Sequence, residues 1–222
     1  MSEVTVASLD PRQQQLAENA RLALERGQLD YVLEVTAVIL HSNPGCLPLR
    51  RLQRAAQLRR CPAWRRWLAR LLNPVAAWLT GAGMVHPARA FATAEQRLAR
   101  NPCNVPALQL LARAAAALDL PATAAFAFEA VRELEPGNRS NLLALGEAWL
   151  AAGQPAEALR LADHLLAERP GEAGALALQR KASVVQTVKQ GNWESPGTFR
   201  DKLKDEASRP PFVRGPGSAS LS

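Results

Sequence analysis

HPARAFATAEQRLARNP (86–102), LPATAAFAFEAVRELEP (120–136) and QPAEALRLADHLLAERP (154–170) have one length and align without a gap. Each stretch has Pro-Ala at its second and third positions and closes with proline. Both prolines recur at one constant spacing, here called the repeat period: Pro87, Pro121 and Pro155, and Pro102, Pro136 and Pro170. Proline suits the first turn of a helix, where its missing N–H has no intrahelical partner, and it disfavours helix in the residue before it. The pattern therefore predicts three equivalent helices.

The segments between these stretches also have the apolar spacing of helices. We call them first-type helices, because each is the first helix of a pair, and we call the proline-flanked stretch that follows each one a second-type helix. In 141–155, Leu142, Leu145, Gly146 and Trp149 fall on one helical face, and 107–121 has the equivalent arrangement. A glycine on an apolar face lets a neighbouring helix approach closely. We therefore expect Gly146 to meet Ala158 within one helix pair, with Trp149 buried beside them.

The period extends toward the N-terminus with one interruption. Residues 13–44 resemble the later copies and end at Pro44, but the distance from Pro44 to Pro102 is longer than one repeat period. The excess falls at 61–85. The sequence thus predicts four helix pairs, the second of them interrupted, with these boundaries: 13–46, 47–104, 105–138 and 139–172.

The pattern L-x-x-L-G-x-x-W…G…A…A…P between Leu142 and Pro170 resembles the tetratricopeptide repeat, whose length of about 34 residues equals the repeat period. The resemblance covers residues 13 to 172, and the whole chain is also similar to bacterial tetratricopeptide proteins. It implies an all-α fold, a right-handed superhelical array of four helix pairs. We expect 1–12 to be an extension, 173–207 to hold a capping helix and a short charged helix, and 208–222 to be disordered.

Composition agrees with a helical protein. Of 222 residues, 48% are hydrophobic but only 5% aromatic, so alanine and leucine dominate the apolar content. The N-terminal residues are polar, and no stretch reaches about 18 uninterrupted apolar residues, so we expect neither a secretory signal nor a transmembrane helix. Three widely spaced cysteines without a C-x-x-C motif favour reduced thiols and a cytoplasmic location over a disulfide framework or a metal site.

No catalytic motif is found. His41, His86 and His164 are isolated, and no glycine-rich loop follows a strand. The sequence therefore predicts a protein without enzymatic activity, cofactor or metal, which acts as a scaffold or adaptor. Its expected partner is a protein, bound as a peptide or a helix in the concave groove that the first helices of the pairs would line. Besides Ala17, the predicted groove residues are Arg21, Gln109, Leu110, Arg113, Leu143, Glu147 and Leu150.

Positive charge is concentrated in one region. Residues 35–94 contain nine arginines and no acidic residue, and the rest of the chain carries a formal charge of −2, since the total is +7. This concentration predicts a basic patch that would suit an acidic partner or an anionic membrane surface. Its residues are Arg50, Arg51, Arg54, Arg59, Arg60, Arg65, Arg66 and Arg70.

The insertion 61–85 carries Trp64, Trp67 and Trp78 at a spacing that places them with leucines on one helical face. Four hypotheses fit this pattern: packing on the array itself, a protein partner, a membrane surface, or nucleic acid. The last is weakest, because no nucleic-acid-binding motif is found. We expect packing on the array. The alternative function is a peripheral membrane or nucleic-acid-associated protein that uses the segment 50–79.

Overall fold

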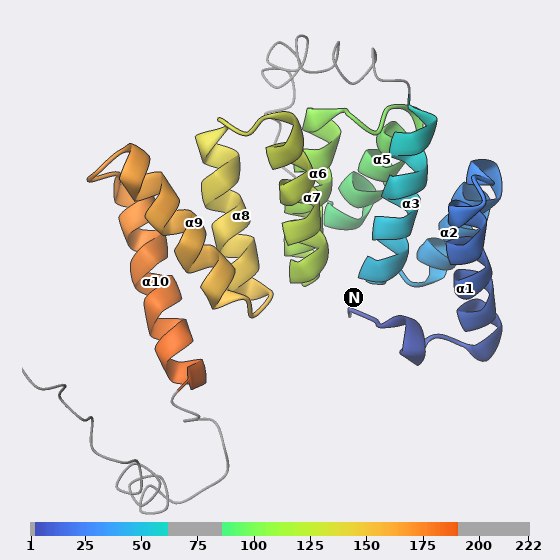
Figure 1. Ribbon diagram of the computed structural model, residues 1–222, viewed down its shortest axis with the longest axis horizontal. Helices are drawn as coiled ribbons and strands as arrows, with labels where there is room; N and C mark the ends of the chain where they lie inside the picture. The colour runs from blue at the N-terminus through green and yellow to red at the C-terminus, as the bar shows by residue number, and fades with distance from the viewer. Residues whose placement is uncertain (1–2, 62–85, 191–222) are drawn as a thin grey trace, which may run out of the picture. The chain divides into compact units, whose positions relative to one another are not determined.

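The computed structural model describes residues 3–61 and 86–190, and every regular element within these ranges is a helix (Figure 1). The elements are η1 (Val6–Ser8), α1 (Pro11–Glu25), α2 (Leu29–Ser42), α3 (Leu47–Arg60), α5 (Pro87–Arg100), α6 (Val105–Ala117), α7 (Pro121–Leu134), α8 (Arg139–Ala151), α9 (Pro155–Glu168) and α10 (Ala173–Gln190). The predicted all-α class is confirmed for this part of the chain.

The chain divides into two compact units, Met1–Val185 and Gln186–Ser222. The core, the cavity and the ion pairs described below belong to the first unit. Of the second unit, the described part is residues 186–190 at the end of α10. The predicted insertion apart from Cys61, the predicted short helix at 199–207 and the predicted tail at 208–222 lie outside the described residues.

Helix boundaries follow the repeat period. Helices α5, α7 and α9 have 14 residues each, and each starts at a proline one period after the previous one. Helices α6 and α8 have 13 residues each, and their first residues are also one period apart. Asn104 and Asn138 precede these two helices, and each side chain accepts a hydrogen bond from the backbone N–H three residues later. The repeating helices predicted from the prolines are therefore confirmed in length and position.

Equivalent turns join the two helices within the third and the fourth pair. Asp119 and Gly153, one period apart, both have a positive φ, 59° and 71°. The residue after each donates its backbone N–H to a carbonyl five residues earlier: Leu120 to Ala115, and Gln154 to Trp149. A hydrogen bond of this kind closes the last turn of a helix when the next residue has a left-handed backbone. Glycine adopts that backbone conformation without strain.

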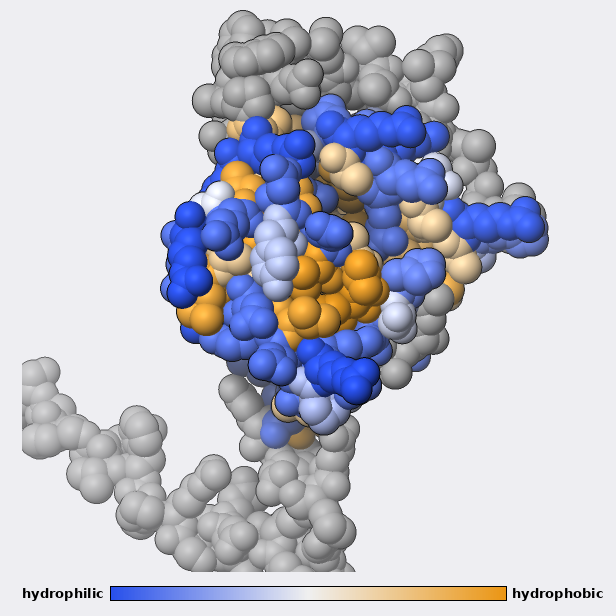
Figure 2. All heavy atoms as spheres, turned by 90° about the vertical axis from the view of Figure 1, so that its right-hand side faces the viewer, coloured by the Kyte–Doolittle hydropathy of each residue, from blue (hydrophilic) through white to orange (hydrophobic). Residues whose placement is uncertain are grey.

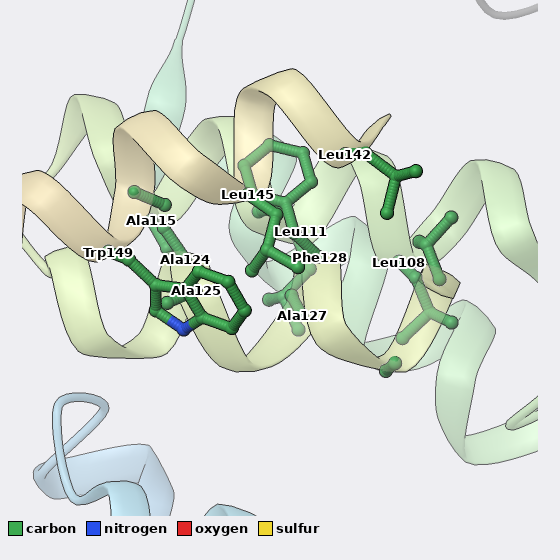
Figure 3. Close-up of a cluster of buried hydrophobic side chains, with 14 of the residues drawn as sticks. Leu108, Leu111, Ala115, Ala124, Ala125, Ala127, Phe128, Leu142, Leu145 and Trp149 are labelled. Atoms are coloured by element: carbon green, nitrogen blue, oxygen red, sulfur yellow. The ribbon is translucent and has the colours of Figure 1, made fainter. Parts of the chain in front are cut away.

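Helices α6, α7 and α8, here called the central stack, contribute many of the buried side chains of the main hydrophobic core (Figure 3). Six pairs of positions one period apart are buried in α6 and α8, and Ala124 and Phe128 of α7 lie among them. Three of these pairs are Leu108 with Leu142, Leu111 with Leu145, and Ala115 with Trp149. Ala124 is fully buried, so small side chains let the helices approach closely where the sequence predicted it.

The last described helix, α10, covers the end of the array, with Ala175, Leu178 and Ala182 buried. Gly146 is buried on α8, but the three atoms that a Cβ at this position would meet first all belong to Leu178 of α10. Leu178 is thus the neighbour nearest to this glycine, and the expected contact of Gly146 with Ala158, which is also buried, stays a prediction. The glycine makes room for the next first-type helix along the chain, because a large leucine points at it.

The opposite end of the array carries exposed apolar side chains. Leu16 of α1, and Tyr31 and Val38 of α2, are the exposed large apolar residues of these two helices. Figure 2 views the molecule from this end and shows an apolar area framed by hydrophilic residues. In the described part of the chain, this end has no counterpart of α10.

The interrupted second pair departs from the regular packing. Close backbone approaches join consecutive helices from α1 to α3 and from α5 to α9, and α3 also approaches α7. Helices α3 and α5, which the sequence predicted to form one pair, are joined instead through side chains, as described below. We call this boundary between α1–α3 and α5–α9 the seam.

Candidate functional site

The predicted groove residues of α6 and α8 occupy matching positions. Gln109 and Leu143 are one repeat period apart, and so are Arg113 and Glu147. Arg113 and Glu147 are exposed, whereas Gln109 and Leu143 are half-buried. The two helices therefore present the same pattern, a half-buried position one turn before an exposed charge.

Three predicted groove leucines combine a buried and an accessible side. Leu110, Leu143 and Leu150 are partly buried and pack against the main hydrophobic core. Such side chains extend the core to the surface and leave apolar area for a partner. Glu147 beside them is paired with Lys181 of α10 at 2.7 Å.

The contribution of α1 differs from the expectation. Ala17 is 5% exposed, so it belongs to the core and cannot line a groove. Arg21 is exposed, but its guanidinium pairs with Glu18 at 2.6 Å and with Glu25 at 2.7 Å on the same helix. Hydrogen bonding to Arg21 lowers the pKa of Glu18, so both partners stay charged and largely neutralise one another.

The predicted basic patch is corrected at two positions. Arg50 and Arg54 of α3 are 3% and 8% exposed, so they contribute no charge to the surface. They are buried because α3 turns this face toward α5 and α7, which, with the loops beside them, supply carboxylates and carbonyl oxygens. Arg65, Arg66 and Arg70 lie outside the described residues.

The other described arginines of the patch are exposed, and two of them bind the first helix pair. Arg59 donates a hydrogen bond to the backbone oxygen of Leu24 at 2.7 Å, and Arg60 pairs with Asp30 at 2.7 Å. Arg51 is exposed on the same helix. Within the described ranges, the patch therefore consists of Arg51, Arg59 and Arg60.

Arg50 joins three elements at the seam. Its Nε donates to the backbone oxygen of Pro44 at 2.8 Å, and its Nη2 lies 2.9 Å from Glu95 Oε1 of α5. The guanidinium carbon also lies 4.7 Å from the centre of the Phe91 ring, a cation–π distance. Burial lowers the pKa of Arg50, which the negative charge of Glu95 opposes.

Arg54 lies one turn further along α3. Its Nη1 donates to the backbone oxygen of Pro102 at 3.2 Å, and its Nη2 is 3.6 Å from Glu133 Oε2 of α7. Burial lowers the pKa of Arg54 as well. Glu133 is largely exposed, so its charge is screened by solvent and compensates Arg54 less well than a buried carboxylate would.

A cavity of about 250 Å³ opens beside these arginines. Its rim is exposed and its floor is buried, and five helices supply its walls: α2, α3, α5, α6 and α7. The exposed rim residues are Ala37, His41, Gln96 and Ala99. The buried floor residues are Leu40, Arg50, Arg54, Leu98, Leu108 and Leu111.

A further contact crosses the seam at the N-terminal segment. The N–H of Val4 donates to the backbone oxygen of Gly45 at 3.2 Å, and the carboxylate of Glu3 accepts hydrogen bonds from the backbone N–H groups of Ala122 and Thr123. Leu120, which precedes α7, provides no side-chain cap. Glu3 therefore caps α7 from 119 residues away, and a carboxylate is favoured at a helix N-terminus.

The cysteines lie in the interior. Cys46, Cys61 and Cys103 are all buried, and none of them forms a disulfide. Burial raises the pKa of the Cys46 thiol, which keeps it protonated at neutral pH. Within 3–61 and 86–190, no group of three or more His, Cys, Asp or Glu side chains could hold a metal ion, and no helix is long and apolar enough to cross a membrane.

Comparison with models of known protein families finds no match to this sequence, and a search of curated proteins finds no relative.

Proposed function

We propose that this protein is a non-enzymatic adaptor that binds a peptide or a helix of a partner protein on the first helices of a tetratricopeptide-like, right-handed superhelical array. The single observation that carries the proposal is the repetition of a surface pattern on α6 and α8. At positions one period apart, a half-buried residue, Gln109 or Leu143, lies one turn before an exposed charge, Arg113 or Glu147. The half-buried leucines Leu110 and Leu150 lie on the same two helices. The identical lengths and spacing of the helices support the tetratricopeptide-like arrangement.

This surface suits an amphipathic segment. An apolar side of the ligand would rest against Leu110, Leu143 and Leu150, and a polar side would reach the flanking charges. The alternative, a peripheral membrane or nucleic-acid protein, loses part of its support because Arg50 and Arg54 are buried. Three exposed arginines of the patch remain in the described region, and two of them already bind Leu24 and Asp30 of the first helix pair.

The test is affinity purification from cells that express the protein, comparing the wild type with Arg113→Glu. Arg113 is exposed, so the charge reversal should leave the melting temperature unchanged while it releases the specific partner. Arg97→Glu provides a matched control, because Arg97 is an exposed arginine of the second-type helix α5. A partner that is retained by Arg97→Glu and lost by Arg113→Glu supports the proposal.

A second arm separates the alternative. The purified protein is mixed with anionic vesicles and with RNA at two salt concentrations. Salt-sensitive binding that Arg51→Glu abolishes and Arg113→Glu leaves intact would favour the membrane or nucleic-acid function and contradict the adaptor.

A further inference from the structure

The charges around the seam cavity do not balance. Arg50 and Arg54 lie on its floor, whereas Glu95 is the acidic residue of its lining. Both arginines are more than nine-tenths buried, so water screens them little. Glu133, the ion-pair partner of Arg54, lies outside the lining and is mostly exposed. Among the Arg and Glu side chains of the lining there is thus one more positive than negative charge.

The Arg54 guanidinium also has a donor available. Nη2 of Arg54 is buried and forms no hydrogen bond with any described residue, whereas the buried Nη2 of Arg50 has Glu95 Oε1 at 2.9 Å as its ion-pair partner. The Arg54 Nη2 is 3.6 Å from its ion-pair partner, which is too far for a hydrogen bond. A buried donor without an acceptor costs free energy, more so when it is charged, and an acceptor brought to it recovers that cost.

The other side chains of the cavity floor are apolar, and glutamine side chains line the sides. Leu40, Leu98, Leu108 and Leu111 are buried around the arginines, and Phe126 is half-buried. Gln53, Gln57 and Gln96 lie closer to solvent. A small number of polar groups in an apolar hollow is the usual composition of a site for a small molecule.

From these features we propose that the seam cavity binds a small monocarboxylate with an apolar body, whose carboxylate accepts hydrogen bonds from Arg54 and Arg50. One negative charge matches the excess positive charge of the lining, and a guanidinium pairs with a carboxylate through two parallel hydrogen bonds. The apolar body would rest on the leucines and on Phe126. The cavity volume of about 250 Å³ is below that of sites for drug-sized ligands, about 300–1,000 Å³, so the acid must be small.

Inorganic phosphate fits less well. At neutral pH it carries up to two charges, and Glu95, whose carboxylate lies 2.9 Å from Arg50 Nη2, would repel the second. Phosphate also has no apolar part to cover the leucines.

The ligand would contact both sides of the seam, because α2 and α3 supply one wall and α5, α6 and α7 supply the other. Binding to the folded chain alone raises its stability. The inference is independent of the adaptor function, since none of the predicted partner-binding residues lines the cavity.

The experiment is a calorimetric titration of the purified full-length protein with benzoate and with butyrate, accompanied by thermal melts. Benzamide and butanamide, which have the same shapes without the charge, are the controls, and inorganic phosphate is a third probe. We expect both carboxylates to bind one per chain and to raise the melting temperature, whereas the amides and phosphate do neither.

Two variants locate the site. Arg54→Gln should weaken carboxylate binding by about tenfold or more, the effect of losing a charged hydrogen bond. Arg51→Gln, an exposed neighbour on α3 outside the lining, should bind as the wild type does. If Arg54→Gln does not fold, Ala99→Trp decides instead, because Ala99 is exposed at the rim and a tryptophan there would obstruct the opening.

The proposal is overturned if no carboxylate binds, if amides or phosphate bind as well as the acids, or if both site variants keep wild-type affinity.

Discussion

The central stack and the seam solve the same problem, the packing of neighbouring helices, with different chemistry. In the central stack, leucine, alanine and tryptophan side chains at positions one repeat period apart are buried against one another (Figure 3). At the seam, two buried arginines and a cavity lie where an apolar contact between α3 and α5 would otherwise form. Helices that follow the repeat without interruption pack through matching apolar faces. The two helices of the interrupted pair are joined by ion pairs and hydrogen bonds of buried arginines.

The two kinds of contact differ in what they tolerate. Apolar packing depends on volume and is sensitive to the addition or removal of a methyl group. A buried ion pair depends on having both partners, because removing one leaves an uncompensated charge in a medium of low polarity. The predictions below use this difference, from the largest expected effect to the smallest.

Shortening a leucine should cost more in the central stack than at the seam. Leu145 is fully buried among packed neighbours, so Leu145→Ala creates a new void and should lower the free energy of unfolding by about 4 kcal/mol. Leu40 already borders the cavity, so Leu40→Ala should cost about 2 kcal/mol. Urea unfolding followed by circular dichroism measures both. Equal costs would show that the seam is as closely packed as the stack.

Enlarging Gly146 tests the packing of α8 against α10. A leucine at this position would overlap Leu178, and Gly146→Leu should cost about 1–3 kcal/mol in unfolding free energy. Gly137→Ala is the control, because a Cβ there meets no atom within 4 Å. It should change the stability by no more than about 0.5 kcal/mol. If adding Leu178→Ala restores the stability lost in Gly146→Leu, the contact between residues 146 and 178 is confirmed. If the double variant is no more stable than Gly146→Leu, this contact is contradicted.

At the seam, removing the carboxylate should cost more than removing the arginine. Glu95→Gln leaves the buried Arg50 cation without its partner and should cost about 2 kcal/mol. Arg50→Met fills the same space with apolar atoms and leaves Glu95 with access to water, so it should cost about 1 kcal/mol or less.

The measurement is again urea unfolding, at low and at high salt. Because Arg50 is 3% exposed, salt should reduce the effect of Glu95→Gln only slightly. The reverse order of the two costs would mean that Arg50 stabilises the seam by packing and hydrogen bonding more than by charge.

The smallest effect concerns the ion pair between Arg139 of α8 and Glu172, which precedes α10. Hydrogen bonding to Arg139 lowers the pKa of Glu172 below its ordinary value of 4.5. The folded state therefore binds this proton less readily than the unfolded state, so the carboxylate contributes stability above pH 4.5 that is lost as the pH falls through the lowered pKa. The melting temperatures of wild type and Glu172→Gln should differ at neutral pH and converge in acid. A difference that is unchanged at the lowest pH would contradict the assignment.

The sequence predicted the helices well, because their limits depend on local chemistry. Proline at the first turn and asparagine before the first-type helices act within one helical turn, and the repeat period brings these signals back in each copy. The contact of Gly146 with Leu178 was not predicted, since Leu178 lies beyond the pair to which the glycine belongs. A periodic pattern identifies which face is buried without identifying the neighbour that covers it.

The seam could not be predicted in the same way. Arginine is usually exposed, and Arg50 and Arg54 lie in a run of basic residues without a nearby acid, so a surface patch was the natural expectation. Their partners are distant in sequence: the backbone oxygen of Pro102 is 48 residues from Arg54, and Glu95 follows the insertion that interrupts the second pair. The cavity arises from this long-range arrangement and has no local pattern.

The Glu3 carboxylate at the start of α7 has a consequence for the order in which the protein folds. Contacts between consecutive helices involve residues close in sequence and can form quickly, while a contact across 119 residues must wait for the chain between to become ordered. During synthesis Glu3 emerges early, yet its binding site is complete only after Thr123 and the first turn of α7 have left the ribosome. The N-terminal segment therefore docks late, and a fusion partner placed close before Glu3 would interfere with the final step of folding while leaving the repeats themselves intact.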